Sequence, residues 1–180
     1  MNRLAISFAA AALVAAPAVF AQSIGEKTGV NSALGISPTT QDFVKEAANS
    51  DMLEIATAKV AEEKGNPEEK KFAEQMINDH TKTTTDLKGM VSSGEVKADL
   101  PTSLDESSQK KLDKLRDTKA SAFSGEYDPM QVSAHKDAVS LFERYSKSGD
   151  NAKLKDWAGK TLPTLRHHLD MAEALNKARD

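Results

Sequence analysis

The stretch that decides the fold is GNPEEKKFAEQMINDH, residues 65–80. Gly65 is typical of a helix end, and Asn66-Pro67 begins a new helix with a capping side chain and a proline suited to the first turn. From there the apolar residues recur at helical spacing. His80 lies at the middle of that apolar face. The stretch therefore predicts a tight helical hairpin with a polar group facing inward.

The pattern around this turn predicts two long helices, over 38–64 and 67–93. The first of these helices should start at Ser37-Pro38, where a capping residue is followed by a proline. At about 100° per residue the first helix has one apolar face, and Glu54 falls inside it. The apolar members of that face are Phe43, Ala47, Ala58 and Ala61. Glu54 should therefore point into the core.

The second half of the chain predicts another pair of helices. One covers 128–147 and starts at an aspartate followed by a proline, and the other begins near Asp150. His135 lies on the apolar side of the first of these helices. His168 lies on the apolar side of the second, whereas its neighbour His167 points to the polar edge.

Two local features modify this four-helix pattern. Ser103 to Glu106 has the capping-box pattern and predicts a short connecting helix that ends near Thr118. Pro163 lies within the last helix and removes one backbone hydrogen bond, which predicts a kink or a break near 159–162. The fold class predicted is all-α, a four-helix bundle with an additional short connecting helix.

The inward polar side chains should also lie at similar depth in the bundle. Glu54 is eleven residues before Gly65. His80 is thirteen residues after Pro67, so at about 1.5 Å per residue the two differ by roughly 3 Å in height. Asp51 matches the height of His80 slightly better but lies nearer the edge of the apolar face. The two later histidines are likewise near the middle of their helices.

Three imidazoles and a carboxylate at one level suit zinc, copper, iron or nickel. The candidate metal ligands are Glu54, His80, His135 and His168. A competing interpretation is a buried hydrogen-bond network, in which Glu54 accepts from an imidazole and fixes the helix register. A haem b site with methionine and histidine ligands is a further alternative. No residue is assigned a catalytic role.

The composition narrows the classes of function. The chain has 180 residues, no cysteine and a formal charge of −3, which excludes disulfides and thiolate ligands to a metal. Basic residues alternate with acidic ones and aromatics make up 5% of the chain, a composition that does not favour nucleic acid as a partner.

The N-terminus has the features of a secretory signal. A short positive start precedes an apolar run and small residues, with cleavage expected after Ala21. No second hydrophobic stretch follows, which predicts a mature chain without a transmembrane segment. We expect a signal peptide over 1–21, a flexible arm over 22–37 and one helical domain over 38–180. A cysteine-free exported chain suits the bacterial periplasm.

Four segments carry a resemblance to a known family: residues 43–55, FAEQMINDHTK at 72–82, QVSAH at 131–135 and TLPTLRHHL at 161–169. They resemble the exported bacterial family called domain of unknown function 4142. The resemblance implies a ferritin-like helical bundle, often labelled a predicted outer-membrane protein without demonstrated activity. The family positions that the resemblance assigns to this chain are Glu54, His80, His135 and His168.

Di-iron sites of ferritin-like proteins use Glu-x-x-His on two helices. In this chain the residues three before the histidines are Ile77, Val132 and Leu165, which favours a mononuclear, histidine-rich site. The expected function is binding of a transition metal in the periplasm, linked to stress or metal handling. The alternative is a non-catalytic envelope stress or interaction protein with a polar hydrogen-bonded core. An enzymatic activity is not indicated.

Overall fold

The computed structural model describes residues 29–178. The expected signal peptide, its cleavage site after Ala21 and the first part of the expected arm lie outside this range. Within it the chain forms helices and no strand, which confirms the all-α prediction. The elements are α2 (Val30–Ala33), α3 (Thr40–Lys64), α4 (Pro67–Ser92), α5 (Glu106–Asp117), a 3₁₀ turn (Ala120–Ala122), α6 (Phe123–Ser148) and α7 (Ala152–Ala178).

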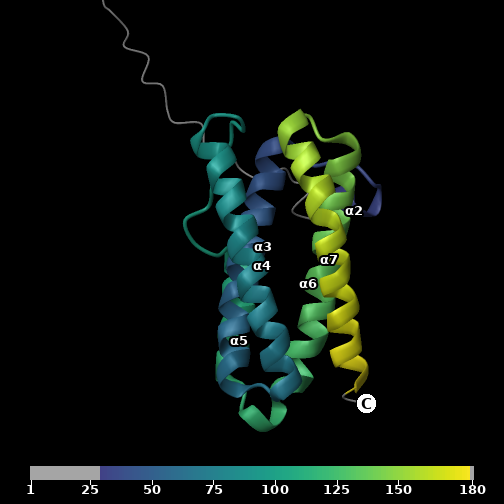
Figure 1. Ribbon diagram of the computed structural model, residues 1–180. Helices are drawn as coiled ribbons and strands as arrows, with labels where there is room; N and C mark the ends of the chain where they lie inside the picture. The colour runs from purple at the N-terminus through teal and green to yellow at the C-terminus, as the bar shows by residue number, and fades with distance from the viewer. Residues whose placement is uncertain (1–28, 179–180) are drawn as a thin grey trace, which may run out of the picture.

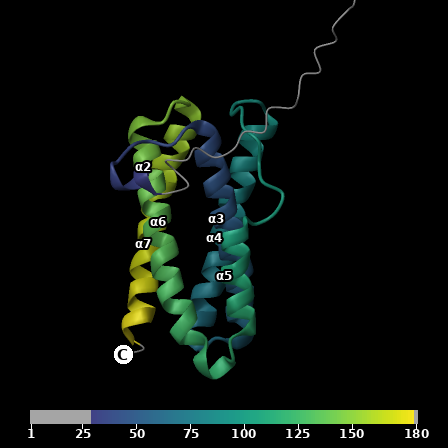
Figure 2. The same ribbon diagram turned by 180° about the vertical axis from the view of Figure 1, so that it is seen from behind.

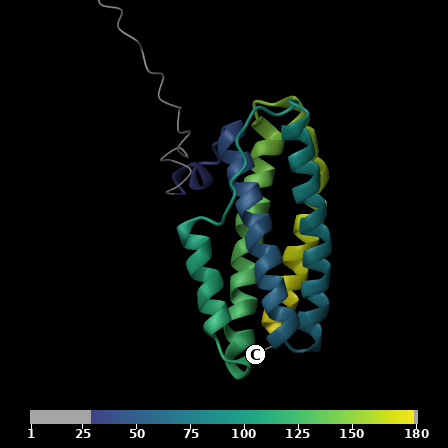
Figure 3. The same ribbon diagram turned by 90° about the vertical axis from the view of Figure 1, so that its left-hand side faces the viewer.

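The four long helices form two hairpins that lie side by side (Figure 1). One hairpin is α3 and α4, and the other is α6 and α7, with α3 beside α6 and α4 beside α7. Seen from behind, α2 lies across α6 (Figure 2). The short helix α5 packs outside the bundle against α3, as Figure 3 shows from the side. No helix among the described residues is long and apolar enough to cross a membrane.

Polar side chains define where the helices begin. Asn66 forms the predicted cap of α4, as part of a capping box with Glu69. The other two starts differ from the prediction. Thr39 caps α3, so this helix begins two residues later than expected from Ser37-Pro38. Asp105 caps α5 by accepting from the Ser108 N–H at 2.7 Å, so Ser103 does not form the predicted capping box.

The two interior prolines do not end their helices. The start predicted for α6 at residue 128 is wrong, because the helix begins at Phe123 and contains Pro129. Of the kink or break predicted near 159–162, the break does not occur, because α7 continues through Pro163. In both helices the residue four positions before the proline is a glycine, Gly125 or Gly159. The proline ring crowds the carbonyl of that residue, and a glycine there can tilt its peptide with little strain.

The apolar core is divided into two clusters by a layer of polar side chains. The cluster near the α6–α7 turn includes Phe43, Phe142 and Tyr145. The cluster near the α3–α4 turn includes Phe72 and Met76. The buried polar side chains between them are Asp51, Glu54, His80, His135 and His168. Burial of so many polar groups in one layer requires partners for their nitrogens and oxygens.

Candidate metal centre

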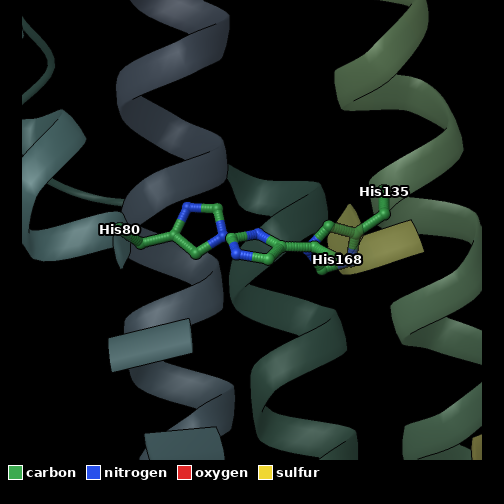
Figure 4. A group of neighbouring side chains, drawn as sticks. All are labelled: His80, His135 and His168. Carbon is green, nitrogen blue, oxygen red and sulfur yellow. The ribbon is translucent and has the colours of Figure 1, made fainter. Parts of the chain in front are cut away.

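Three imidazoles from three helices meet in this layer (Figure 4). His80 comes from α4, His135 from α6 and His168 from α7, and each is at most 2% exposed. One ring nitrogen of each histidine lies within 4.8 Å of the others. The ring centroids are 5.4 to 5.9 Å apart. Three of the four candidate ligands from the sequence are therefore brought together.

The outer nitrogen of each imidazole has a hydrogen-bond acceptor. His80 Nδ1 is 2.8 Å from Asp51 Oδ1, and His168 Nε2 is 2.8 Å from Asp79 Oδ2. His135 Nδ1 donates to its own helix, to the carbonyl oxygen of Gln131 at 2.9 Å. A carbonyl or an ionised carboxylate only accepts, so each outer nitrogen carries the proton of its neutral ring.

The inner nitrogens therefore present lone pairs to one another. They are Nε2 of His80, Nε2 of His135 and Nδ1 of His168, all buried and without a hydrogen-bond partner among the described residues. While all three rings are neutral, these facing acceptors do not form a hydrogen-bond network, because none of them supplies a donor. A cation that accepts three nitrogen lone pairs would satisfy all of them together. Metal-binding histidines commonly donate their other N–H to a carboxylate or a carbonyl, as these three do.

Asp51 organises the α3 side of this layer. Its Oδ2 accepts from the hydroxyls of Thr83 at 2.8 Å and Thr84 at 3.0 Å, while its Oδ1 faces His80. The hydroxyls orient the carboxylate, and the carboxylate in turn orients the imidazole. In the sequence Asp51 matched the height of His80 slightly better than Glu54, although Glu54 was the candidate on the apolar face, and the structure places the contact at Asp51.

Glu54 lies next to the histidines but apart from their nitrogen cluster. It is 2% exposed, its charge raises the pKa of both His80 and His135, and its Oε2 has no hydrogen-bond partner among the described residues. No Glu54 oxygen joins the group of ligand atoms within 4.8 Å, as far as the described residues go. In the hydrogen-bonded alternative Glu54 accepts from an imidazole, but here the acceptors are Asp51 and Asp79.

Burial and the neighbouring carboxylates set the protonation of the three rings. Burial lowers the pKa of His168 to about 4, against the opposing effect of its bond to Asp79. Burial also lowers the pKa of His135, which Glu54 only partly offsets. For His80 burial acts in the same direction, but the hydrogen bond and the charge of Asp51 outweigh it and the pKa is raised. At neutral pH His135 and His168 are therefore unprotonated and able to donate lone pairs.

Asp79 is the neighbour that sequence reasoning missed. It lies on the half-exposed side of α4, where its carboxylate accepts from Gln75 and from His168. The helical face of α4 gave no reason to single it out. Its contact depends on how α4 packs against α7, and a single sequence does not show that packing. The signal that could have raised it is its position directly before His80.

Two surface cavities lie away from the histidines. One, of about 780 Å³, is at the end of the bundle where α4 begins, and its lining includes Asn66 and Leu175. The other, of about 440 Å³, lies between α2 and α6, and its lining includes Ser32 and Arg144. Neither cavity is lined by His80, His135 or His168. The centre is enclosed by its own helices, so a ligand there must be small.

A known protein family matches nearly the whole bundle. The model of a family described as a domain of unknown function, DUF4142, matches residues 25–175. The chain belongs to the DUF4142 family. The match covers α3, α4, α6 and α7 as far as residue 175, with the three clustered histidines, and it confirms the resemblance in the sequence. No curated protein and no solved structure matches this DUF4142 chain. Its function must therefore be argued from the centre itself.

Proposed function

We propose that this DUF4142 protein binds one transition metal ion through His80, His135 and His168. The observation that carries the proposal is the set of three buried inner nitrogens, which face one another with their lone pairs and have no hydrogen-bond donor among the described residues. Zinc, copper and iron all accept imidazole nitrogen. Glu54 belongs to the same centre as a nearby negative charge.

Charge supports a cation over an uncharged polar core. Asp51, Glu54 and Asp79 all raise the pKa of His80 by their charge, so three carboxylates act on one place in the bundle. A divalent cation coordinated by the three imidazoles would offset most of that negative charge. Buried charges are otherwise costly unless they are paired or coordinate a metal.

Thermal unfolding with added metal tests the proposal. A ligand that binds only the folded chain stabilises it by about 2.7 kcal/mol at a hundredfold excess over its Kd, so added zinc or copper should raise the melting temperature. The double change His80→Ala with His135→Ala should remove this shift, because a single imidazole remains. His167→Ala is the control, since His167 is exposed and should change stability by less than about 0.5 kcal/mol.

Two results would reject the metal proposal. One is a wild-type chain whose melting temperature does not respond to zinc, copper or iron at neutral pH. The other is a double variant that responds as strongly as the wild type. Either result would leave the second candidate, a non-catalytic envelope protein whose polar layer serves only the fold.

We also propose that the mature chain works in the periplasm. The support is the N-terminal sequence, with its positive start, apolar run and small residues before Ala21. Mass spectrometry of the exported protein should then give a chain that begins at Gln22. Retention of residues 1–21 in the exported fraction would contradict this location.

A further inference from the structure

We propose that the metal keeps a fourth coordination position facing Glu54, and that this position takes a small neutral hydrogen-bond donor, of which water is the simplest. The inference rests on the metal binding proposed above. It adds a binding position for a small neutral molecule on the metal. It also makes Glu54 the hydrogen-bond acceptor of that molecule and not a metal ligand.

The direction of the fourth position follows from the helices. The three imidazoles come from α4, α6 and α7, so α3 is the one long helix that contributes none. A tetrahedral ion held by three ligands from three sides directs its fourth position to the remaining side. On α3 the buried acidic residues at this level are Asp51 and Glu54. Asp51 is already bonded to His80, Thr83 and Thr84, which leaves Glu54.

Glu54 is placed to hold a ligand of the metal. No oxygen of Glu54 lies within the 4.8 Å cluster that the three ring nitrogens form, although its charge acts on His80 and His135. A small molecule between the metal and the carboxylate fits both facts. The molecule would give a lone pair to the metal and a hydrogen to Glu54 Oε2, which has no other partner among the described residues.

The unpartnered atoms beside this position are acceptors. Besides Glu54 Oε2 they include Oε1 of Gln131, whose amide nitrogen is 3.4 Å from the hydroxyl of Thr57. Gln131 lies one turn before His135 on α6. Tyr127, whose unpartnered hydroxyl can donate or accept, lies two turns before His135, about 12 Å along the helix at the level of the backbone. Unpaired buried acceptors require a donor, so the ligand must carry N–H or O–H groups.

Charge and enclosure exclude anions. The carboxylates of Asp51, Glu54 and Asp79 already exceed the charge of a divalent ion, and an anionic ligand would add another buried negative charge. His80, His135, His168 and Glu54 are each at most 2% exposed, so a ligand enclosed among them is also small. Water, ammonia and hydrogen peroxide meet these conditions. Azide, thiocyanate and carboxylates do not.

Cobalt(II) provides a visible spectrum that reports on the fourth ligand. Wild type, Glu54→Gln and the control Glu74→Gln are loaded with one equivalent of cobalt(II) and titrated with azide. Glu74 is exposed on α4, so the control removes the same charge away from the centre. Wild type and control should keep their spectra, whereas Glu54→Gln should bind azide at least about tenfold more tightly, because the repelling charge is gone. Before azide is added, Glu54→Gln should bind cobalt(II) more weakly than the wild type, because a neighbouring negative charge is lost, but it should keep the four-coordinate spectrum.

Two results would overturn this inference while leaving metal binding intact. Azide binding by the wild type as tight as by Glu54→Gln would show that Glu54 does not exclude anions. Loss of the four-coordinate spectrum in Glu54→Gln alone would make Glu54 itself the fourth ligand. A wild type that binds no cobalt(II), copper(II) or zinc would remove both this inference and the proposed function.

A measurement on the wild type covers the case in which Glu54→Gln fails to fold. Pulsed electron paramagnetic resonance of the copper(II)-loaded chain is compared in H₂O and D₂O. A ligand that donates to Glu54 has exchangeable hydrogens, so deuterium modulation from a directly coordinated molecule is expected. A copper(II) spectrum with three imidazole nitrogens and no coordinated exchangeable hydrogen would overturn the inference.

Discussion

Asp51 and Asp79 decide which nitrogen two of the imidazoles offer to the centre. Each carboxylate accepts the N–H of one ring, Asp51 from His80 and Asp79 from His168. The opposite ring nitrogen then carries a lone pair and points inward. For His135 the carbonyl oxygen of Gln131 has the same effect. The nitrogens available to a metal thus depend on residues that contact only the outer side of the imidazole rings.

Replacement of Asp51 tests this dependence. Asp51→Asn keeps the shape of the side chain but removes its negative charge. The carboxylate orients the imidazole of His80 and accepts from the hydroxyls of Thr83 and Thr84. We expect the affinity for zinc to fall by about ten- to a hundredfold, the usual effect of losing a partner of a metal ligand. Competition with a chelator measures the affinity. Asp86→Asn, on the surface beside Lys82, is the control, and an equal loss in the two variants would contradict the orienting role.

The protonation of His168 predicts a pH dependence for the metal-free chain. The pKa of His168 is lowered to about 4 by burial, while an unfolded histidine has a pKa of about 6.5. As the pH falls through this window the unfolded chain takes up the proton first. The folded state should therefore lose stability, by up to about 3 kcal/mol from this residue. His135 acts in the same direction. The raised pKa of His80 acts in the opposite one, because its contribution is lost as the pH rises.

Urea unfolding at about pH 7 and about pH 4.5, with a chelator present, measures this loss for wild type and His168→Gln. The glutamine amide can still donate to Asp79, but it does not titrate. The variant should therefore lose less stability on acidification. An acid-dependent loss of the same size in both chains would show that His168 is not the group responsible.

At this scale the sequence predicted the inward side chains but not their partners. A 100° rotation per residue was enough to put Glu54, His80, His135 and His168 on apolar faces, and all four are buried. The partners depend on packing between helices, as with Asp79 of α4 and His168 of α7. The separation of Glu54 from the nitrogen cluster depends on the same packing between helices. The projection of a single helix shows which way a residue faces but not how far it lies from residues on other helices.

The start of α4 was predicted correctly, whereas Thr39 and Asp105 cap α3 and α5 two residues after the serines expected to do so. Asn66 behaves as expected, because its contacts are all within four residues. The start of α6 was placed five residues late, because an aspartate followed by a proline is typical of a helix start. Pro129 and Pro163 remain inside helices whose apolar faces are buried on both sides of the proline. Packing over the whole helix thus outweighs the loss of one hydrogen bond.

Two glycines, one just after α6 and one inside α4, allow a pair of opposite predictions. An alanine Cβ at Gly149, just after α6, would lie 2.5 Å from the ring of Tyr145, which is buried and stacked on Phe43. Gly149→Ala should therefore reduce stability by about 1–3 kcal/mol. Gly89→Ala, inside α4 with open space around it, should increase stability by about 0.5–1 kcal/mol. Chemical denaturation compares the two, and a Gly149→Ala variant as stable as Gly89→Ala would contradict the close packing at the α6–α7 turn.

The whole molecule holds three of its four histidines in a layer between two apolar clusters. Each of three long helices contributes one imidazole, and the fourth contributes two carboxylates, Asp51 and Glu54. The two hairpins are therefore joined across their middle by polar groups rather than by apolar packing alone. Metal binding at this level would connect α4 with α6 and α7, and so would stabilise the contact between the hairpins.

X-ray absorption at the zinc edge tests the central claim most directly. The chain is loaded with one equivalent of zinc at neutral pH, and excess metal is removed before the measurement. We predict a retained ion with three imidazole nitrogens at about 2.0–2.1 Å and one further light-atom ligand. No retained zinc, or an ion surrounded by oxygen without the scattering of imidazole rings, would contradict a metal centre formed by His80, His135 and His168.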